Sequence, residues 1–203
     1  MNLSQLRTAV DRRTGIAIDA LAALELINEA NRAIAADQDW PWLARSTTFA
    51  TVVGTDTYSA ASAIPADWLR TIGLKIADDE PMRWRSRNDL DAEWPSATSG
   101  RPREYTFDAS AIVLRPVPDS VVTVTHRYYR MEPELAGDTD VPSLPALFHP
   151  AIVEYSAHLV LRRAREAERA AECLASFERW RNRMLDDARR HAGPAKVRLR
   201  RRR

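Results

Sequence analysis

The sequence has very few of the residues that mark secreted or membrane proteins. Its 203 residues include one cysteine, Cys173, so no internal disulfide can form and nothing indicates an oxidising compartment. No apolar run reaches the roughly 20 residues of a membrane-spanning helix. The opening stretch MNLSQLRTAVDRRTG also lacks the apolar core of a signal peptide. We therefore expect a protein that is made in a cytoplasm and has no membrane partner.

The sequence motifs of common enzymes are also missing. The glycines stand singly, which excludes a P-loop and a dinucleotide-binding fingerprint, and no GxSxG nucleophile elbow occurs. Cys173 has no basic or histidine neighbour in the sequence, so we expect a buried or half-buried small side chain rather than a reactive thiolate. The sequence therefore predicts no catalytic residues, no cofactor and no enzymatic activity.

Scattered histidines and acidic clusters are the remaining candidates for metal binding. Glu154 and His158 are four residues apart in a predicted helix, but the HExxH order is absent, so an ordinary surface contact between them is favoured. His126 lies in an alternating strand and is expected to be hydrogen-bonded within the sheet. The acidic clusters at 78–80 and 138–140 fall in predicted turns, where such residues serve local purposes. We therefore predict no metal site.

The charge of the chain is divided unevenly along its length. The 192 residues before Gly193 contain all 28 acidic and 24 of the 30 basic residues, a net charge of −4. Residues 193–203 carry six cations and no acid. Such a basic arm usually contacts a partner, and either an acidic protein surface or nucleic acid fits it. No aromatic residue follows Ala192 to stack on bases, so sequence-specific recognition of nucleic acid is not expected.

Two helices are predicted at the start of the chain. The first covers residues 4–13 with Ser4 as its N-cap, and the second covers residues 18–36 with apolar side chains at helical spacing. A proline then stops the helix, because proline disfavours helix in the residue before it. Trp40 and Trp42 flank that proline, and we expect them to pack between the helix and the segment that follows.

From residue 47 to residue 131 the pattern changes to that of short strands. Gly54-Thr55-Asp56 predicts the turn of a hairpin between the first two strands, and Ser86 or Asn88 can cap a short helix. The last strand alternates, with Val122, Val124, His126 and Tyr128 on one face. The strand candidates are residues 47–53, 56–60, 69–76, 82–85, 103–107, 111–117 and 120–131.

Helical periodicity returns near the end of the chain. Residues 132–144 are polar and rich in proline, which predicts a surface connection. Residues 145–191 then keep an apolar stripe that contains no glycine, and no proline occurs in it after Pro150. One helix of more than forty residues satisfies this pattern, and so does an antiparallel pair that turns within residues 163–168. The periodicity leaves both open.

Together these elements predict an α+β fold. N- and C-terminal helices form a bundle, because each has an apolar stripe to bury, and a small antiparallel β domain is inserted between them. The expected divisions are 1–46 (N-terminal helices), 47–131 (β insertion), 132–192 (C-terminal helices) and 193–203 (basic extended arm).

Several stretches follow one another in a recognisable order. They are LELINEANRAI with DWPWL, then FATVVGTDTY, IPADWLR, GRPREYTF, AIVLRPVPDS and VTVTHRYYR, and finally PSLPALFHPAIVEYSAHLVL and LASFERWRNRML. In order and spacing, the chain from about Leu24 to Leu185 resembles the head-to-tail connector (adaptor) proteins of tailed bacteriophages and of gene transfer agents.

The resemblance implies a structural virion protein of the neck. Copies would form a homo-oligomeric ring, a dodecamer by analogy, between the portal protein and a tail-side neck or stopper protein. Genome DNA would cross the lumen without specific recognition. The C-terminal segment would bind the portal, and its candidate residues are Arg189, Arg190, Lys196, Arg198, Arg200, Arg201, Arg202 and Arg203.

Other functions remain open at this point. A tail-completion or tail-tube protein would keep the virion but change the place of the protein in it. A small nucleic-acid-binding regulator would use the basic arm and show a steep salt dependence. An unrecognised hydrolase is the least favoured, since no acid, base and nucleophile converge.

Overall fold

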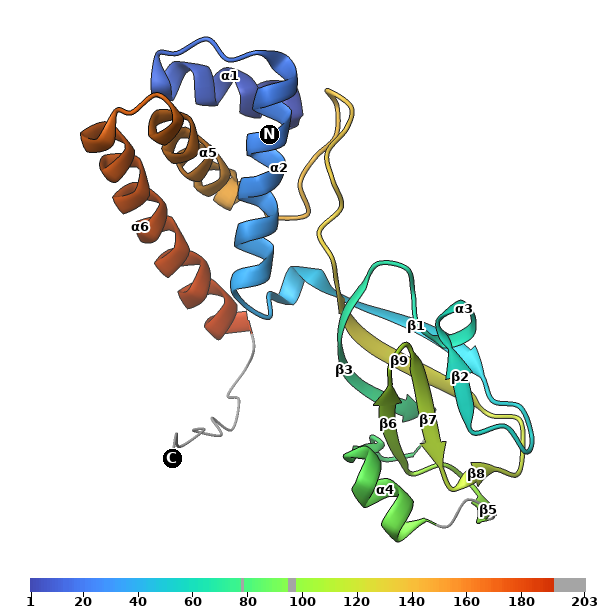
Figure 1. Ribbon diagram of the computed structural model, residues 1–203. Coiled ribbons are helices and arrows are strands. Elements are labelled where there is room, and N and C mark those ends of the chain that lie inside the picture. Colours follow the sequence, from blue (N-terminus) through green and yellow to red (C-terminus); the bar gives the residue numbers. More distant parts are fainter. Residues whose placement is uncertain (78, 95–97, 192–203) are drawn as a thin grey trace. The chain divides into compact units, whose positions relative to one another are not determined.

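The computed structural model describes residues 1–77, 79–94 and 98–191, which fall into two compact units (Figure 1). Residues 1–43 and the chain from Glu132 onward form the first unit, and Ala44–Met131 form the second. The predicted α+β class is confirmed, with the longer helices in the first unit and the short strands in the second.

Helices build the first unit. Each buries an apolar stripe: Leu3, Leu6 and Val10 recur at helical spacing in the first helix and are at most 1% exposed. Full burial of one such side chain contributes about 1.5–3 kcal/mol. The elements are α1 (Leu3–Thr14), α2 (Ala20–Asp37), η1 (Pro41–Leu43), η2 (Ala146–Phe148), α5 (His149–Arg163) and α6 (Ala167–His191).

The N-terminal cap of α1 differs from the prediction. The cap is Asn2 rather than Ser4: the Asn2 side chain accepts from the Gln5 amide at 3.0 Å, and the Gln5 side chain accepts from the Asn2 amide at 3.0 Å. This reciprocal pair is a capping box, which satisfies two amides that the helix leaves without partners. A serine at position 4 matched the consensus for a cap, but the geometry places the extended residue two positions earlier.

The C-terminal helical run turns, which settles the alternative that periodicity left open. Helices α5 and α6 are separated by Ala164–Glu166 and pack against each other. Arg165 adopts a left-handed conformation (φ 63°), and the Glu166 amide donates to the Leu161 carbonyl at 2.9 Å. A left-handed residue with such a bond is a usual way to end a helix. Ala157, Leu161, Ala170 and Cys173 then form a shared cluster.

The connection at residues 132–144 is more than a surface loop. Leu135 and Leu144 are buried, and the Asn28 side chain of α2 bonds both backbone groups of Leu135 at 2.9 Å. The amides of Leu3 and Ser4 donate to carbonyls of Asp140 and Asp138 in the same connection. The segment therefore closes the open end of α1, which its polar composition did not predict.

Two main sheets face each other in the second unit. One has the order β1-β9-β3 and the other β2-β7-β6-β4, with a small β5-β8 pair. Most pairs are antiparallel as predicted, but β4-β6 and β5-β8 are parallel two-residue pairs. The elements are β1 (Ala44–Ala50), β2 (Thr57–Ser59), α3 (Ala60–Ala63), β3 (Trp68–Ile76), β4 (Arg83–Trp84), α4 (Arg87–Glu93), β5 (Ser99–Gly100), β6 (Glu104–Asp108), β7 (Ala111–Arg115), β8 (Val117–Pro118) and β9 (Thr123–Arg130).

The predicted hairpin at Gly54 is wrong. Strand β1 pairs with β9 and β2 pairs with β7, so the loop at residues 51–56 carries the chain from one sheet to the other. Phe49 and Tyr58 meet across the interior with ring centroids 5.3 Å apart. Phe49 on β1 and Tyr58 on β2 therefore enter the core from opposite sheets. A direct hairpin would have placed both strands in one sheet.

The core of the second unit lies between its two sheets. Phe49, Leu74 and Val124 come from the first sheet, whereas Ile112 and Leu114 come from the second. On β9 the alternation holds: Val124, His126 and Tyr128 are buried while their neighbours face outward. Of the two predicted caps of α4, Ser86 and Asn88, the structure shows Ser86. Its hydroxyl accepts from the Asp89 amide.

Candidate interaction surfaces

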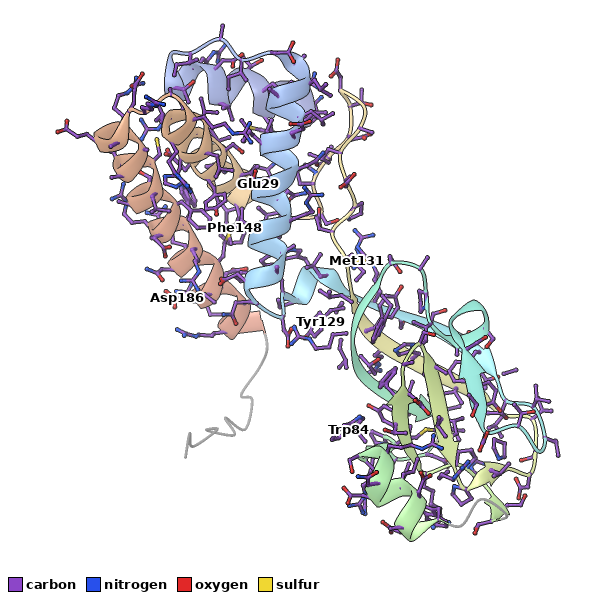
Figure 2. The ribbon with its side chains drawn as sticks, in the orientation of Figure 1. Glu29, Trp84, Tyr129, Met131, Phe148 and Asp186 are labelled. Atoms are coloured by element: carbon purple, nitrogen blue, oxygen red, sulfur yellow. The ribbon has the colours of Figure 1, made fainter. Side chains whose placement is uncertain are left out.

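A hollow of about 350 Å³ lies beside the last turns of α6 in the first unit. One wall is formed by η2, where Leu147 is 68% exposed and Phe148 is buried. The other wall belongs to α6, from which Trp180 and Asp186 contribute (Figure 2 labels Phe148 and Asp186). The hollow therefore joins an exposed aliphatic side chain, an indole and charged groups, a mixture that suits a peptide rather than a small apolar ligand. The lining residues are Leu147, Phe148, Trp180, Arg183, Asp186, Asp187 and Arg190.

Aromatic rings of Trp40 and Trp42 pack behind the η2 wall of this hollow. Trp40 is fully buried, donates its indole N–H to the Ile34 carbonyl at 2.6 Å, and stacks on Trp42 with centroids 4.6 Å apart. The ring centroids of Trp42 and Phe148 in turn lie 6.3 Å apart. The prediction that the two tryptophans pack after α2 is confirmed, and their rings hold the η2 wall in place. On the α6 wall, the Arg183 guanidinium lies 4.9 Å above the Trp180 ring.

The residues predicted to bind the portal begin at this hollow. Arg190 lines it, and Arg189 is exposed with a 3.4 Å contact to Asp186. The remaining candidates lie outside the described residues, so their prediction stands as it was. They are Lys196, Arg198, Arg200, Arg201, Arg202 and Arg203. The hollow cannot be read from the sequence, because Leu147 and Trp180 come together only when α5 and α6 pack against each other.

Exposed valines form a second candidate surface, at one end of the β unit. Val52, Val53 and Val121 are 56%, 57% and 68% exposed. Their two loops are tied together, since the Thr51 amide donates to Val122 at 2.9 Å and the Val122 amide donates to the Thr51 hydroxyl at 2.8 Å. Because three β-branched apolar side chains are exposed together on these tied loops, we regard them as a candidate contact point.

A charged hollow of about 480 Å³ lies elsewhere in the β unit. At its floor is Glu104, only 4% exposed, whose carboxylate accepts from the Trp94 indole at 2.9 Å and from Arg85 at 3.2 Å. These bonds compensate the buried charge, so Glu104 is a structural residue. Nearby on β4, Trp84 is 61% exposed (Figure 2). The other lining residues are Asp79, Glu80, Pro81, Arg83, Glu93, Arg101, Pro102 and Arg103.

The histidine and cysteine candidates have structural partners. The expected contact between Glu154 and His158 is wrong: Glu154 accepts from Arg13, and His158 Nδ1 donates to the Ala170 carbonyl at 2.8 Å. Because that carbonyl only accepts, His158 Nδ1 carries the proton. Cys173 is buried as predicted, and burial raises the pKa of its thiol.

The acidic cluster at 138–140 serves its own turn. Asp140 accepts from the amides of Ala136 and Gly137, both at 2.8 Å, and these bonds lower its pKa. Asp138 pairs with Arg7 at 2.7 Å. In the cluster at 78–80, residue 78 lies outside the described residues. Nowhere in the described part of the chain do three histidine, cysteine or carboxylate side chains gather as a metal site would require.

These features are those of a protein that acts through its surfaces. The chain belongs to the SU10 adaptor protein family, whose model matches residues 1–200. It is accordingly a bacteriophage structural adaptor, which confirms the resemblance drawn from the sequence. No curated protein matches the chain. Each helix of the described residues is too short or too polar to cross a bilayer.

Proposed function

We propose that copies of this chain form a closed ring in the neck of the virion, joining the portal protein to a tail-side neck or stopper protein. The observation that carries the proposal is the family match over residues 1–200. An adaptor needs two unlike contacts, and the chain offers two unlike surfaces: the α6 hollow with Arg190, and the valines Val52, Val53 and Val121.

The portal contact is assigned to the end of α6 and the arm that follows. Arg189 and Arg190 are exposed on the last described turn, and the six further cations of residues 193–203 continue from it. Cations clustered in this way favour an acidic partner surface, with which they can form charge-assisted hydrogen bonds.

A ring also lets modest contacts suffice. A head-to-tail contact whose rotation closes repeats one interface around the ring. Once the first arm is bound, the others act at a high effective concentration, so overall affinity exceeds that of any single arm. The proposed function therefore depends on the complementary shape and charge of surfaces that bind one another.

A pull-down with purified portal tests this assignment. Deleting residues 194–203 and substituting Arg189→Gln/Arg190→Gln should each weaken portal capture at least tenfold, because both remove cations from the proposed contact. The matched control is Arg162→Gln/Arg163→Gln, which removes two exposed cations at the end of α5. Equal capture by all variants would contradict the role of the arm.

Electron microscopy of particles should show one ring beneath the portal; stacked rings along the tail would identify a tube protein instead.

A further inference from the structure

The outward face of the β1-β9-β3 sheet has an unusual composition. Strand register places Thr125, Arg127 and Tyr129 of the central strand on the side opposite the core. Flanking them are small or hydroxyl residues of β1, and Arg70, Gly73 and Lys75 of β3. The paired outward positions are Ala44, Ser46, Thr48, Ala50, Thr123, Thr125, Arg127, Tyr129, Arg70, Gly73 and Lys75.

This face carries cations and no carboxylate. Three of its paired positions are basic, although the chain before Gly193 is net acidic. Among the described residues, the structure records no ion pair or side-chain hydrogen bond for Lys75 or Arg127. Their charges are therefore available to a partner, whereas Arg115 forms an ion pair with Asp56 inside the fold.

Arg127 is also unobstructed. Its neighbours across the sheet are Ser46 on β1 and Gly73 on β3, two of the smallest residues available. A Cβ added at Gly73 would meet no atom within 4 Å. A flat, rigid partner can therefore approach the central strand closely and reach the guanidinium directly.

We propose that this face binds the sugar-phosphate backbone of double-stranded DNA, without reading its sequence. Arginine, lysine and hydroxyl side chains are the groups that contact phosphates. Outward positions on one strand repeat at about 6.8 Å, so the face offers donors along a continuous polyanion. With the ring of the proposed function, on which this inference rests, the face would line the path of the genome.

An acidic protein surface is the less suitable occupant. Stable protein interfaces have an apolar core with a polar rim. The paired outward positions hold no aliphatic side chain larger than alanine, and the exposed Leu69 and Ile72 of β3 lie at the two bulges where the register shifts. Interfaces with DNA are more polar and more positively charged, as this face is.

The salt dependence of DNA binding by the full chain tests the proposal. Fluorescence anisotropy on a short mixed-sequence duplex, followed from about 50 to 200 mM salt, counts phosphate contacts, because each adds about 0.9 to the slope of log K against log salt. Lys75→Gln/Arg127→Gln should lower that slope by roughly 2. Arg162→Gln/Arg163→Gln should leave it unchanged.

A second pair of variants changes the face without removing a cation. Gly73→Glu would place a carboxylate beside Arg127 in open space, and should weaken DNA binding severalfold. Gly73→Gln adds the same bulk without charge and should bind as the unmodified chain does. Equal binding by the two Gly73 variants, or an unchanged slope for Lys75→Gln/Arg127→Gln, would overturn the proposal.

The outcome is separable from that of the portal contact. Lys75→Gln/Arg127→Gln should capture portal normally. If it instead bound DNA normally but lost self-association or portal capture, the face would be a protein interface and our inference would be wrong. Loss of portal capture by the arm variants alone bears only on the proposed function.

Discussion

His126 stands in a chain of hydrogen bonds that its neutral form completes. Its Nδ1 lies 3.0 Å from the Ala63 carbonyl and must donate, so Nε2 accepts, from the Thr71 hydroxyl at 2.8 Å. Thr71 itself accepts from the Trp68 indole at 3.0 Å. A second proton on His126 would leave the Thr71 hydroxyl hydrogen without its acceptor in a fully buried site.

The pH dependence of stability should report this arrangement. Burial lowers the pKa of His126 below 6.5, although its bond to Ala63 acts the other way; burial also lowers that of His149. Below pH 6.5 the unfolded chain takes up protons that the folded chain does not, so stability is lost as pH falls from there. Urea unfolding at several pH values should show this loss of free energy of unfolding. His126→Gln should make the free energy of unfolding depend less steeply on pH in this range.

A matched variant controls that experiment. Thr71→Ser keeps the hydroxyl that donates to His126 and should retain the pH dependence. His126→Gln should also lower the free energy of unfolding by about 1–3 kcal/mol at neutral pH, because it disturbs buried partners. A slope identical to that of the unmodified protein would show that His126 titrates alike in both states.

Residue-level prediction from the sequence succeeded where alternation alone decided the outcome. The pattern of β9 predicts His126 in a strand, on one face with Val124 and Tyr128, and the structure shows all three side chains buried. It failed for Glu154 and His158, because each side chain finds a partner on another helix, Arg13 of α1 and Ala170 of α6. Spacing along one helix carries no information about such neighbours.

At the scale of elements, the cap of α1 offers a direct comparison of expectation and structure. Asn2→Ala should lower the free energy of unfolding by about 1 kcal/mol, since it removes the acceptor for the Gln5 amide. Ser4→Ala, at the position that the sequence favoured, should change stability by less than about 0.5 kcal/mol, because Ser4 is an exposed helical residue. Thermal or urea unfolding distinguishes the two, and the reverse order would restore Ser4 as the cap.

Strand pairing was the weakest part of the prediction. The sequence predicts a strand at residues 69–76, which β3 covers, but it does not predict the partners of β1 and β2. A turn sequence such as Gly54-Thr55-Asp56 fits a hairpin and a crossing between sheets equally well. Burial of Phe49 and Tyr58 from both sides of the core decides between them.

For the whole molecule, two separate cores predict local effects of core variants. Leu114 is fully buried in the cluster of the β unit, so Leu114→Ala should cost about 2–5 kcal/mol. In hydrogen exchange, protection should fall first in residues 44–131, while the slow amides of α5 keep theirs. Ile152→Ala in α5 is the counterpart and should give the opposite pattern. Uniform loss of protection in both variants would show a single cooperative unit.

The sequence by itself determined the class of fold, the positions of most helices and strands, and the resemblance to phage adaptors. Periodicity and turn residues act locally, over a few positions, so they can be read directly from the chain. Tertiary structure alone decided which strands pair, where the 145–191 run turns at Arg165, and how Leu147 and Trp180 come to share a hollow. It also decided that Arg127 stands between Ser46 and Gly73. Each of these depends on contacts between residues far apart in the chain, whose free energy is gained only when whole stripes and sheet faces are buried together.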